Sequence, residues 1–380
     1  MCSPSCFDWW SRLSAVADAR HPASGLSRRS FLLTAAVPIV ATACATSGAP
    51  PSGPTRELLD TTLSFDLHSH PGLFRSMSND SLAGHRRAAE TGFVKLISLT
   101  ATSDAPVLGL NARGGLYATR EPRPGELYAS MYRQLDTLMG WSASAGMPTV
   151  LSVTAAEDPG PPVRGLLAVE GSDFLEGRVE RVQEAFDRGI RSLQLVHYRV
   201  NELGDIQTAA PVHGGLTAFG RTVVREMNRL GMVVDVAHAT PAVVAGVVET
   251  TTQPIILSHS NIQDATGWSR FISPEHARLV AKTGGVIGAM PIIFGRRGDD
   301  ISGYVHYVSR LVDVVGIDHV GLGTDIDGIG PNAIFTSYAR WPSLAAALLD
   351  HGYLSPEVAK VLGGNAQRVF RQGQAASRPS

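Results

Sequence analysis

Eight short runs of β-branched and aliphatic residues recur along this chain, and most are followed by a turn and a longer stretch with helical spacing of its apolar residues. The runs span residues 63–68, 94–99, 165–170, 192–197, 232–238, 254–259, 285–290 and 319–325. Helices are expected between them at 180–188, 218–230, 241–249, 274–282 and 305–314. Because the runs are apolar at nearly every position, they suit strands covered by helices on both faces. This alternation predicts an α/β protein, a (β/α)8 TIM-type barrel over residues 61–373.

One connection in this pattern is much longer than the others. Residues 100–164 separate the second and third predicted strands, and we interpret them as an insertion into the barrel. Its aromatic residues Tyr117, Tyr128, Tyr132 and Trp141 are expected to pack over the barrel, with a contribution to the mouth of a site as the alternative. An open, doubly wound sheet is the alternative architecture.

The first 44 residues have the pattern of an export signal. Arg28 and Arg29 precede an apolar run at residues 31–43, and Cys44 follows it. The run is too short to span a membrane and suits the apolar region of a twin-arginine signal. Two forms of processing remain open, lipid attachment to Cys44 and plain cleavage after an Ala-x-Ala site. The pattern predicts export to the periplasm or to the outer face of a bacterial membrane.

The segments that flank the predicted barrel are polar or rich in small residues. Residues 45–60 contain Pro, Ser and Gly at their start and are expected to form a flexible tether. Residues 374–380 are expected to be a disordered tail. The domain organisation is therefore a signal, a tether, one barrel and a short tail.

Most of the predicted strands end in a histidine or a carboxylate. The residues at or directly after these ends are His68, His70, Glu170, His197, His238, His259 and Asp325. A parallel barrel brings the carboxyl ends of all its strands to one rim, so these side chains are expected to meet in one cavity. Crowded imidazoles and carboxylates are the ligands of divalent metal ions. The cysteines lie only at positions 2, 6 and 44, so a metal in the barrel would have N and O ligands.

The spacing of these residues predicts how they share the metal. His68 and His70 are two apart, so in an extended strand both side chains point to the same side and can hold one ion. His238 and His259 end neighbouring strands and would hold a second ion. Glu170 has two oxygens and can bridge both ions, which a neutral imidazole cannot do. The prediction is therefore a site for two divalent ions.

The charge balance excludes one class of partner. The chain has 33 basic and 34 acidic residues, with a net charge of -1. A protein without excess positive charge has no general attraction to a phosphate backbone. We therefore expect no nucleic-acid partner.

Several short motifs together resemble the membrane dipeptidase (renal dipeptidase) family of zinc peptidases. They are Glu170-Gly171, His197 after an apolar strand, Asp235-Val236-Ala237-His238, Ser258-His259-Ser260, Arg270, the Gly-Leu-Gly-Thr-Asp-Ile-Asp-Gly segment at 321–328 and the Gly-Asn-Ala-Gln-Arg-Val-Phe segment at 364–370. The resemblance covers about residues 60–371. It implies an amidohydrolase-like barrel with two zinc ions, a small peptide substrate and a homodimer.

The resemblance also implies a role for each matched residue. His68 and the residue at 70 would hold one zinc ion, His238 and His259 the other, and Glu170 would bridge them. Arg270 would receive the terminal carboxylate of a dipeptide, His197 would contact the substrate, and Asp325 would be the acid-base group. The family usually has His-x-Asp in the first strand, whereas this chain has His68-Ser69-His70. Some related barrels bridge their metals with a carboxylated lysine, but none of the three lysines lies near these strand ends.

These observations lead to three candidate functions. The first is a zinc-dependent dipeptidase in which a metal-bridging hydroxide attacks the peptide bond and Asp325 carries the proton to the leaving amine. The second is a metal-dependent hydrolase of another amide or ester, such as an N-acyl amino acid or a lactone. The third is a non-catalytic lipoprotein that binds metal or peptide. Asp325 argues against the third candidate, and Arg270 separates the first two, because a lactone has no carboxylate to bind.

Overall fold

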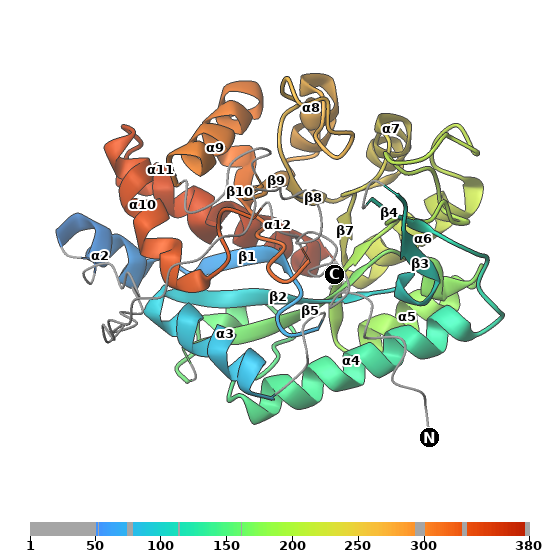
Figure 1. Cartoon of the computed structure of the whole chain (residues 1–380), viewed down its shortest axis with the longest axis horizontal. Helices are drawn as coiled ribbons and strands as arrows, with labels where there is room; N and C mark the ends of the chain where they lie inside the picture. The colour runs from blue at the N-terminus through green and yellow to red at the C-terminus, as the bar shows by residue number, and fades with distance from the viewer. Residues whose placement is uncertain are drawn as a thin grey trace, which may run out of the picture.

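The fold is a closed barrel of eight parallel strands, as the sequence predicts (Figure 1). The computed structural model describes residues 51, 53–73, 79–112, 115–160, 162–292, 301–328 and 333–376. The barrel strands are β1 (Ser64–Ser69), β2 (Val94–Thr102), β5 (Arg164–Glu170), β6 (Ile190–Gln194), β7 (Val233–Asp235), β8 (Ile256–Ser260), β9 (Val286–Ala289) and β10 (Val320–Leu322). Their order around the barrel is β1-β10-β9-β8-β7-β6-β5-β2. The alternative of an open sheet is wrong.

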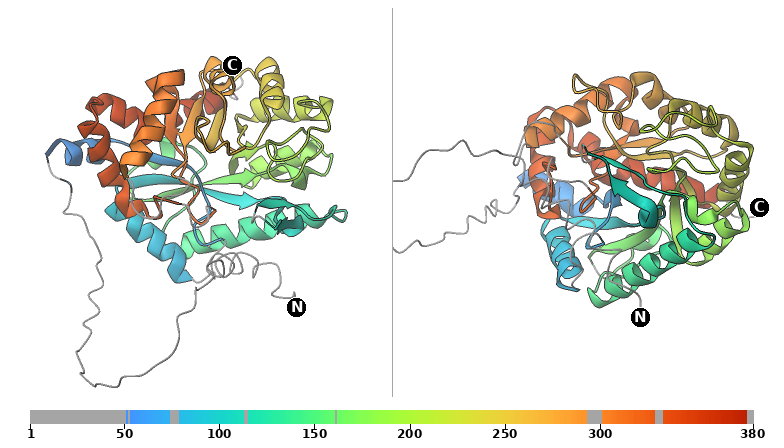
Figure 2. Two further views of the ribbon diagram at one scale, coloured as in Figure 1. Left: turned by 45° about the horizontal axis from the view of Figure 1, so that its top comes forward. Right: turned by 45° about the vertical axis from the view of Figure 1, so that its right-hand side comes forward.

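Helices form a ring outside the strands (Figures 1 and 2). They are α2 (Gly53–Thr61), α3 (Asn79–Thr91), α4 (Glu126–Ser144), α5 (Glu180–Asp187), α6 (Ala218–Leu230), α7 (Pro241–Thr250), α8 (Pro274–Lys282), α9 (Ile301–Val315), α10 (Trp341–Asp350), α11 (Ser355–Ala359) and α12 (Asn365–Ala376). Thr217, Thr240 and Ser273 cap α6, α7 and α8, each accepting a hydrogen bond from a backbone N–H of the first turn. The main apolar core lies between this ring and the outer face of the barrel.

Some strands are shorter than predicted. β7 ends at Asp235 and β10 at Leu322, so His238 and Asp325 lie in the turns that follow rather than at the last strand position. Both residues have a positive φ, 66° for His238 and 50° for Asp325, which is incompatible with an extended strand. β6 also ends before His197. This rim of the barrel therefore consists of strand ends together with the turns that follow them.

The long segment between β2 and β5 is only partly an insertion. Helix α4 lies between consecutive barrel strands and is the second helix of the barrel itself. The added element is the two-stranded antiparallel hairpin of β3 (Leu108–Leu110) and β4 (Leu116–Ala118). Tyr128, Tyr132 and Trp141 of α4 pack, partly buried, against the main core, whereas Tyr117 in the hairpin is exposed.

Helix α12, dark red near the centre of Figure 1, closes the amino-terminal end of the barrel. Ala366, Val369 and Phe370 pack in one apolar cluster with inward side chains of the strands. The rings of Phe65 and Phe370 lie 5.2 Å apart between centroids, and Gln367 Nε2 donates to the Leu63 carbonyl at 2.9 Å. This end of the barrel is therefore filled, and an internal site must open at the other end.

The two flanking segments differ from their predictions where the structure describes them. Residues 53–60, assigned to the tether, belong to helix α2, which buries Leu58 and Leu59 against the core. Helix α12 extends to Ala376, so the first residues of the predicted tail are helical. The predicted signal at 1–44, with Cys44, and the end of the tail at 377–380 lie outside the described residues. Within the described part of the chain, no helix has the length and apolar character needed to cross a membrane.

Candidate metal centre

The structure brings the eight predicted site residues to the carboxyl end of the barrel. His68 lies in β1 and His70 directly follows that strand, and their Nε2 atoms are 3.1 Å apart. Glu170 is the last residue of β5, and its two carboxylate oxygens face these rings. Oε1 is 3.5 Å from His68 Nε2, and Oε2 is 3.4 Å from His70 Nε2. The two-residue spacing in the sequence thus places both imidazoles on one side, facing one carboxylate.

A second pair of histidines faces the same carboxylate. His238 follows β7 and His259 lies in β8, and their Nε2 atoms are also 3.1 Å apart. Glu170 Oε1 is 3.3 Å from His238 Nε2 and 3.7 Å from His259 Nε2. All five residues are buried, with at most 4% of any residue exposed. Glu170 is therefore at the centre of two histidine pairs.

The outer nitrogens of three of these rings are already engaged. His70 Nδ1 is 2.9 Å from the Thr100 carbonyl oxygen, so it carries a proton that it donates there. Ser258 Oγ lies 2.9 Å from His259 Nδ1 and 3.4 Å from His68 Nδ1. A ring that donates from Nδ1 has its lone pair on Nε2, the atom that points to the centre of the site. This is the tautomer that binds a metal ion.

The donor set fits zinc. Two ligands at about 2.0–2.1 Å from a tetrahedral zinc ion stand about 3.3 Å apart, close to the spacing within each histidine pair. Burial and nearby positive charges, including that of Arg270, hold the pKa of His238 and His259 well below its usual range, so both are neutral imidazoles. Although burial acts to raise it, the surrounding imidazoles, His197 and His68 foremost, hold the pKa of Glu170 well below its usual range. Burial acts to lower the pKa of His68, but the charges of Glu170 and Asp325 outweigh it and raise this pKa to about 9, so a proton competes with a metal ion for this ring. Imidazoles around an ionised carboxylate are a donor set that suits a divalent ion such as zinc.

Asp325 stands beside the first pair. Its Oδ1 is 3.5 Å from His70 Nε2 and 3.9 Å from His68 Nε2, and its backbone N–H donates to the His68 carbonyl at 2.8 Å. Burial raises the pKa of this carboxyl, against the opposing effect of the nearby imidazoles. A Cβ at Gly328 would lie 2.0 Å from Asp325 Oδ1, so the turn requires glycine there. The carboxylate is held at the edge of the metal site and can accept or return a proton.

Arg270 is buried in the wall of the site rather than on the surface. It is 2% exposed, its Nη1 donates to Gln207 Oε1, and its Nη2 is 3.1 Å from His259 Nε2. Tyr198 also interacts with this guanidinium. The described hydrogen bonds of Arg270 go to neutral partners, and none of its described ion pairs is with a carboxylate. Its positive charge is therefore available to a ligand. Such a group can bind a substrate carboxylate.

A cavity of about 800 Å³ lies over these residues. The site residues that line it are His70, Glu170, His197, His238, His259, Arg270 and Asp325. Leu108 and Leu116 of the hairpin, with Ser130 and Arg133 of α4, form the opposite wall. Both interpretations of the segment between β2 and β5 therefore apply to parts of it: the hairpin and one face of α4 line the mouth of the site, whereas Tyr128, Tyr132 and Trp141 pack against the core.

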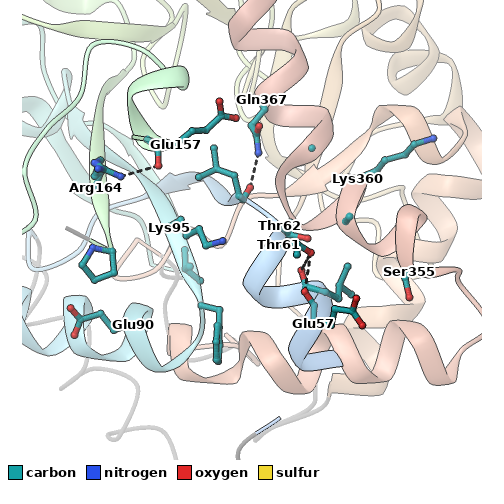
Figure 3. A pocket seen from close by; sticks show the side chains of 18 of the residues that line it. Glu57, Thr61, Thr62, Glu90, Lys95, Glu157, Arg164, Ser355, Lys360 and Gln367 are labelled. Carbon is teal, nitrogen blue, oxygen red and sulfur yellow. Dashed lines mark hydrogen bonds between the residues drawn. The ribbon is translucent and has the colours of Figure 1, made fainter. Parts of the chain in front are cut away.

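A larger cavity, of about 1240 Å³, lies outside the filled barrel interior, beside α2 and α11 near the amino-terminal ends of the strands (Figure 3). Two basic side chains that line it, Arg164 and Lys95, are already bonded to the protein. Arg164 donates to the carbonyls of Ala156 and Asp158, and Lys95 Nζ donates to the Asp60 carbonyl at 2.7 Å. The described residues that line it include no histidine. The smaller cavity is therefore the candidate site, since it contains the convergent ionisable groups.

Sequence reasoning missed three residues of the site. Tyr198 and Gln207 hold Arg270, and Asp104 contacts His197. Asp104 follows β2, so it would have been found if that strand had been predicted to end at Thr102 rather than at residue 99. For Tyr198 and Gln207 the sequence contains no comparable signal, because both lie in loops whose path depends on the tertiary structure.

Fold and site together define a parallel (β/α)8 protein with a histidine-carboxylate metal site at the carboxyl ends of its strands. The family model of the membrane dipeptidases (Peptidase family M19) matches residues 147–380, more than half of the chain. The chain therefore belongs to the membrane dipeptidase family. The match includes Glu170, His197, His238, His259 and the residues beyond them, and it begins after the strand that contains His68.

Similar proteins with curated names include three dipeptidases. The chain is 30% identical over 221 residues to dipeptidase aclJ of Aspergillus oryzae, which covers 55% of this chain and 51% of that protein. It is 32% identical over 216 residues to dipeptidase tcpJ of Claviceps purpurea (54% and 50%) and 30% identical over 217 residues to dipeptidase 3 of Mus musculus (54% and 44%). The chain thus spans about half the length of the curated relatives it matches.

Solved structures show the same fold. The probable dipeptidase PvdM from Pseudomonas aeruginosa superposes with a TM-score of 0.72 and 19% identity, over 85% of this chain and 98% of that one. A metallopeptidase from Rhodobacter sphaeroides, liganded with a phosphinate mimic of the dipeptide L-Ala-D-Ala, gives 0.69 and 19%, over 82% and 99%. At this identity the likeness concerns the fold alone.

Proposed function

We propose that the protein is a zinc-dependent dipeptidase that hydrolyses the peptide bond of a dipeptide with a free carboxyl terminus. The observation that carries this proposal is the arrangement of two histidine pairs around Glu170 at one cavity, with Arg270 beside one pair and Asp325 beside the other. Family membership supports a divalent metal ion at this place.

The residues divide into two metal-holding sets. His68 and His70 would hold one ion, His238 and His259 the second, and Glu170 would bridge them. When bound, such a pair of ions polarises a carbonyl and lowers the pKa of water to about 7, so no serine or cysteine nucleophile is needed.

The remaining residues handle the substrate and its protons. Arg270 binds the terminal carboxylate through its planar guanidinium, which fixes the peptide bond next to the metal ligands. His197 Nε2 points into the cavity; because Nδ1 already donates to Asp104, a second proton on Nε2 makes the ring an imidazolium that donates to the oxygen of the reacting carbonyl, where negative charge develops. Asp325 Oδ1 accepts the proton of the attacking water and returns it to the leaving nitrogen, because an amide nitrogen must be protonated to leave.

The histidine at position 70 changes the charge of the first metal set. A neutral imidazole in place of an aspartate makes the surroundings of that ion one unit more positive. We expect the His68 and His70 set to hold its ion less tightly than the set that contains His238 and His259. Metal titration followed by elemental analysis would then give two steps of different affinity, whereas a single step of two ions would contradict this expectation.

The proposal is tested with purified protein loaded with zinc and a panel of dipeptides. Each dipeptide is compared with its C-terminal amide and with an N-acyl amino acid. We expect hydrolysis of free dipeptides, inhibition by a phosphinate dipeptide mimic and slow or absent hydrolysis of the amides. Turnover of lactones or N-acyl amino acids without turnover of dipeptides would favour the second candidate, a hydrolase of another amide or ester. Stoichiometric zinc with no turnover of any of them would favour a binding protein.

We also propose that the protein is exported by the twin-arginine route, either into the periplasm or to a membrane through a lipid on Cys44, and that it is active as a homodimer. The Arg28-Arg29 pattern and the cysteine after the apolar run support the first two points, and family resemblance supports the third. Replacement of both arginines by lysine should keep the protein in the cytoplasm. In Cys44→Ala, release from the membrane fraction is expected if Cys44 is lipidated. Light scattering of the purified protein tests the dimer.

A further inference from the structure

A buried carboxylate outside the predicted site residues contacts the substrate-facing histidine. Asp104 follows β2 and is 0% exposed. Its Oδ1 accepts a hydrogen bond from His197 Nδ1 at 2.7 Å, and its Oδ2 accepts one from the Tyr198 backbone N–H at 3.0 Å. One carboxylate thus holds both the ring of His197 and the backbone of the next residue.

The support under Asp104 is rigid. Gln134 of α4 brackets Thr102 by accepting from its N–H at 3.0 Å and donating to its carbonyl at 2.8 Å. The Ser103 N–H donates to the Glu170 carbonyl at 2.9 Å, and Ser103 Oγ accepts from the Phe174 N–H at 2.7 Å. The segment that ends in Asp104 is therefore bonded to α4 on one side and to the turn after Glu170 on the other.

Arg199, two residues after His197, forms ion pairs with carboxylates other than Asp104. Arg199 Nη1 pairs with Asp173 Oδ1 at 3.1 Å and Arg199 Nη2 with Glu121 at 2.8 Å. Burial, together with the negative charge of Asp104, raises the pKa of Asp173 to about 7. A buried carboxylate must be hydrogen-bonded to be tolerated, and the partners of Asp104 are the ring of His197 and the Tyr198 backbone.

The opposite side of the His197 ring faces the metal ligands. Its Nε2 is 3.2 Å from Glu170 Oε2. A Cβ at Gly171 would lie 3.2 Å from the His197 Cβ, and Gly171 has a φ of +80°, so glycine lets the turn after Glu170 pass next to this ring. The ring is therefore held at Nδ1, packed on one side, and free to act only at Nε2.

We propose that Asp104 is the positioning residue of His197: it fixes the orientation of the imidazole and keeps a proton on Nδ1, so that Nε2 is aimed at the reacting carbonyl. This inference rests on the proposed dipeptidase function for its catalytic consequence. The same logic holds wherever a carboxylate orients an imidazole that acts through its other nitrogen.

A double-mutant cycle tests the inference. The zinc-loaded variants are Asp104→Ala, His197→Ala and the double variant, with Asp104→Asn as the conservative change and Asp173→Asn as the matched control. Asp173 is equally buried and belongs to the same cluster, but no hydrogen bond links its side chain to His197. For each variant, kcat, KM, zinc content and melting temperature are measured.

We expect Asp104→Ala to lower kcat roughly 10- to 100-fold with little change in KM or zinc content, the range found when the partner of a functional histidine is removed. In the His197→Ala background the same change should cost less than about threefold, because the two residues act as one unit. Asp104→Asn should recover part of the loss, since an amide oxygen can accept from only some of the donors. Equal losses in both backgrounds, or a loss that follows zinc content, would overturn the inference.

A second measurement separates this inference from the proposed function. Nitrogen-15 NMR of the full protein reports which ring nitrogen of His197 carries the proton, whatever the enzyme hydrolyses. We expect Nδ1 to carry a proton in the wild type and in Asp173→Asn, whether or not Nε2 is protonated as well, and a ring protonated at Nε2 alone to appear in Asp104→Ala. If dipeptides are not hydrolysed but this pattern is found, the proposed function fails and the positioning role stands. An unchanged tautomer in Asp104→Ala would sink the positioning role alone.

Discussion

The two ends of the barrel are built from opposite kinds of residues. At the carboxyl end, buried histidines and carboxylates converge, and a cavity of about 800 Å³ lies over them. At the amino end, α12 inserts Val369 and Phe370 among the inward apolar side chains of the strands. The carboxyl end therefore holds the potential metal ligands, and the amino end holds apolar side chains in contact with one another.

The residues that carry function and those that stabilise the fold therefore lie at opposite ends of the barrel axis. In barrels of this type, the turns after the strands vary with the chemistry, whereas the opposite end maintains the fold. Substitutions at the carboxyl end should therefore change turnover or metal binding at nearly constant stability. Substitutions at the amino end should do the reverse.

The largest expected effect is at the carboxyl end. Asp325→Asn keeps the shape of the side chain but removes the proton acceptor, and kcat should fall about 10²- to 10⁴-fold. Zinc content and melting temperature should stay near those of the wild type. Asp318→Asn, at the opposite end and paired with Lys360 on the surface, is the control and should keep full activity. Substantial activity in Asp325→Asn would refute the assigned proton transfer.

The corresponding effect at the amino end is on folding. Phe370 is fully buried against Phe65, and Phe370→Ala should lower the free energy of unfolding by about 3–5 kcal/mol. Below the new melting temperature, kcat and KM per folded molecule should be unchanged. A large loss of kcat in Phe370→Ala while the protein is fully folded would contradict the assignment of stability to one end of the barrel and function to the other.

Metal removal should lower the stability of the whole fold, because an ion that binds only the folded site stabilises the folded state. Zinc binds the folded site, so zinc at 100 times its dissociation constant should stabilise the protein by about 2.7 kcal/mol, and chelation should reverse this. The zinc-induced rise in melting temperature should persist in Phe370→Ala and shrink in His238→Ala. An equal zinc effect in His238→Ala would place the ion elsewhere.

The smallest of these effects concerns substrate choice. Arg270→Lys keeps the charge but loses the planar pair of donors, and kcat/KM for free dipeptides should fall roughly 10- to 100-fold, the equivalent of one charged hydrogen bond. Slow hydrolysis of C-terminal amides should change less than about threefold. Parallel losses on both substrates would mean that Arg270 only supports Gln207 and His259.

Local pattern was enough to predict the elements. Helices α6 and α8 begin and end where their caps and apolar spacing predict, and all eight strands were placed. Strand ends were less predictable, because the positive φ of His238 and Asp325 reflects turns shaped by neighbouring strands. The prediction that the connection between β2 and β5 is an insertion is wrong for its longest part, because α4 is a helix of the barrel itself.

The sequence alone determined which residue types stand at the strand ends: two histidines at a spacing of two, a carboxylate after β5, and histidines after two further strands. Only the tertiary structure decided their distances, the 3.1 Å within each histidine pair and the central place of Glu170. It also decided the contacts of Asp104 with His197 and of Gln207 with Arg270. The physical reason is that a short-range pattern specifies elements, whereas closure of the barrel sets which residues far apart in the chain become neighbours.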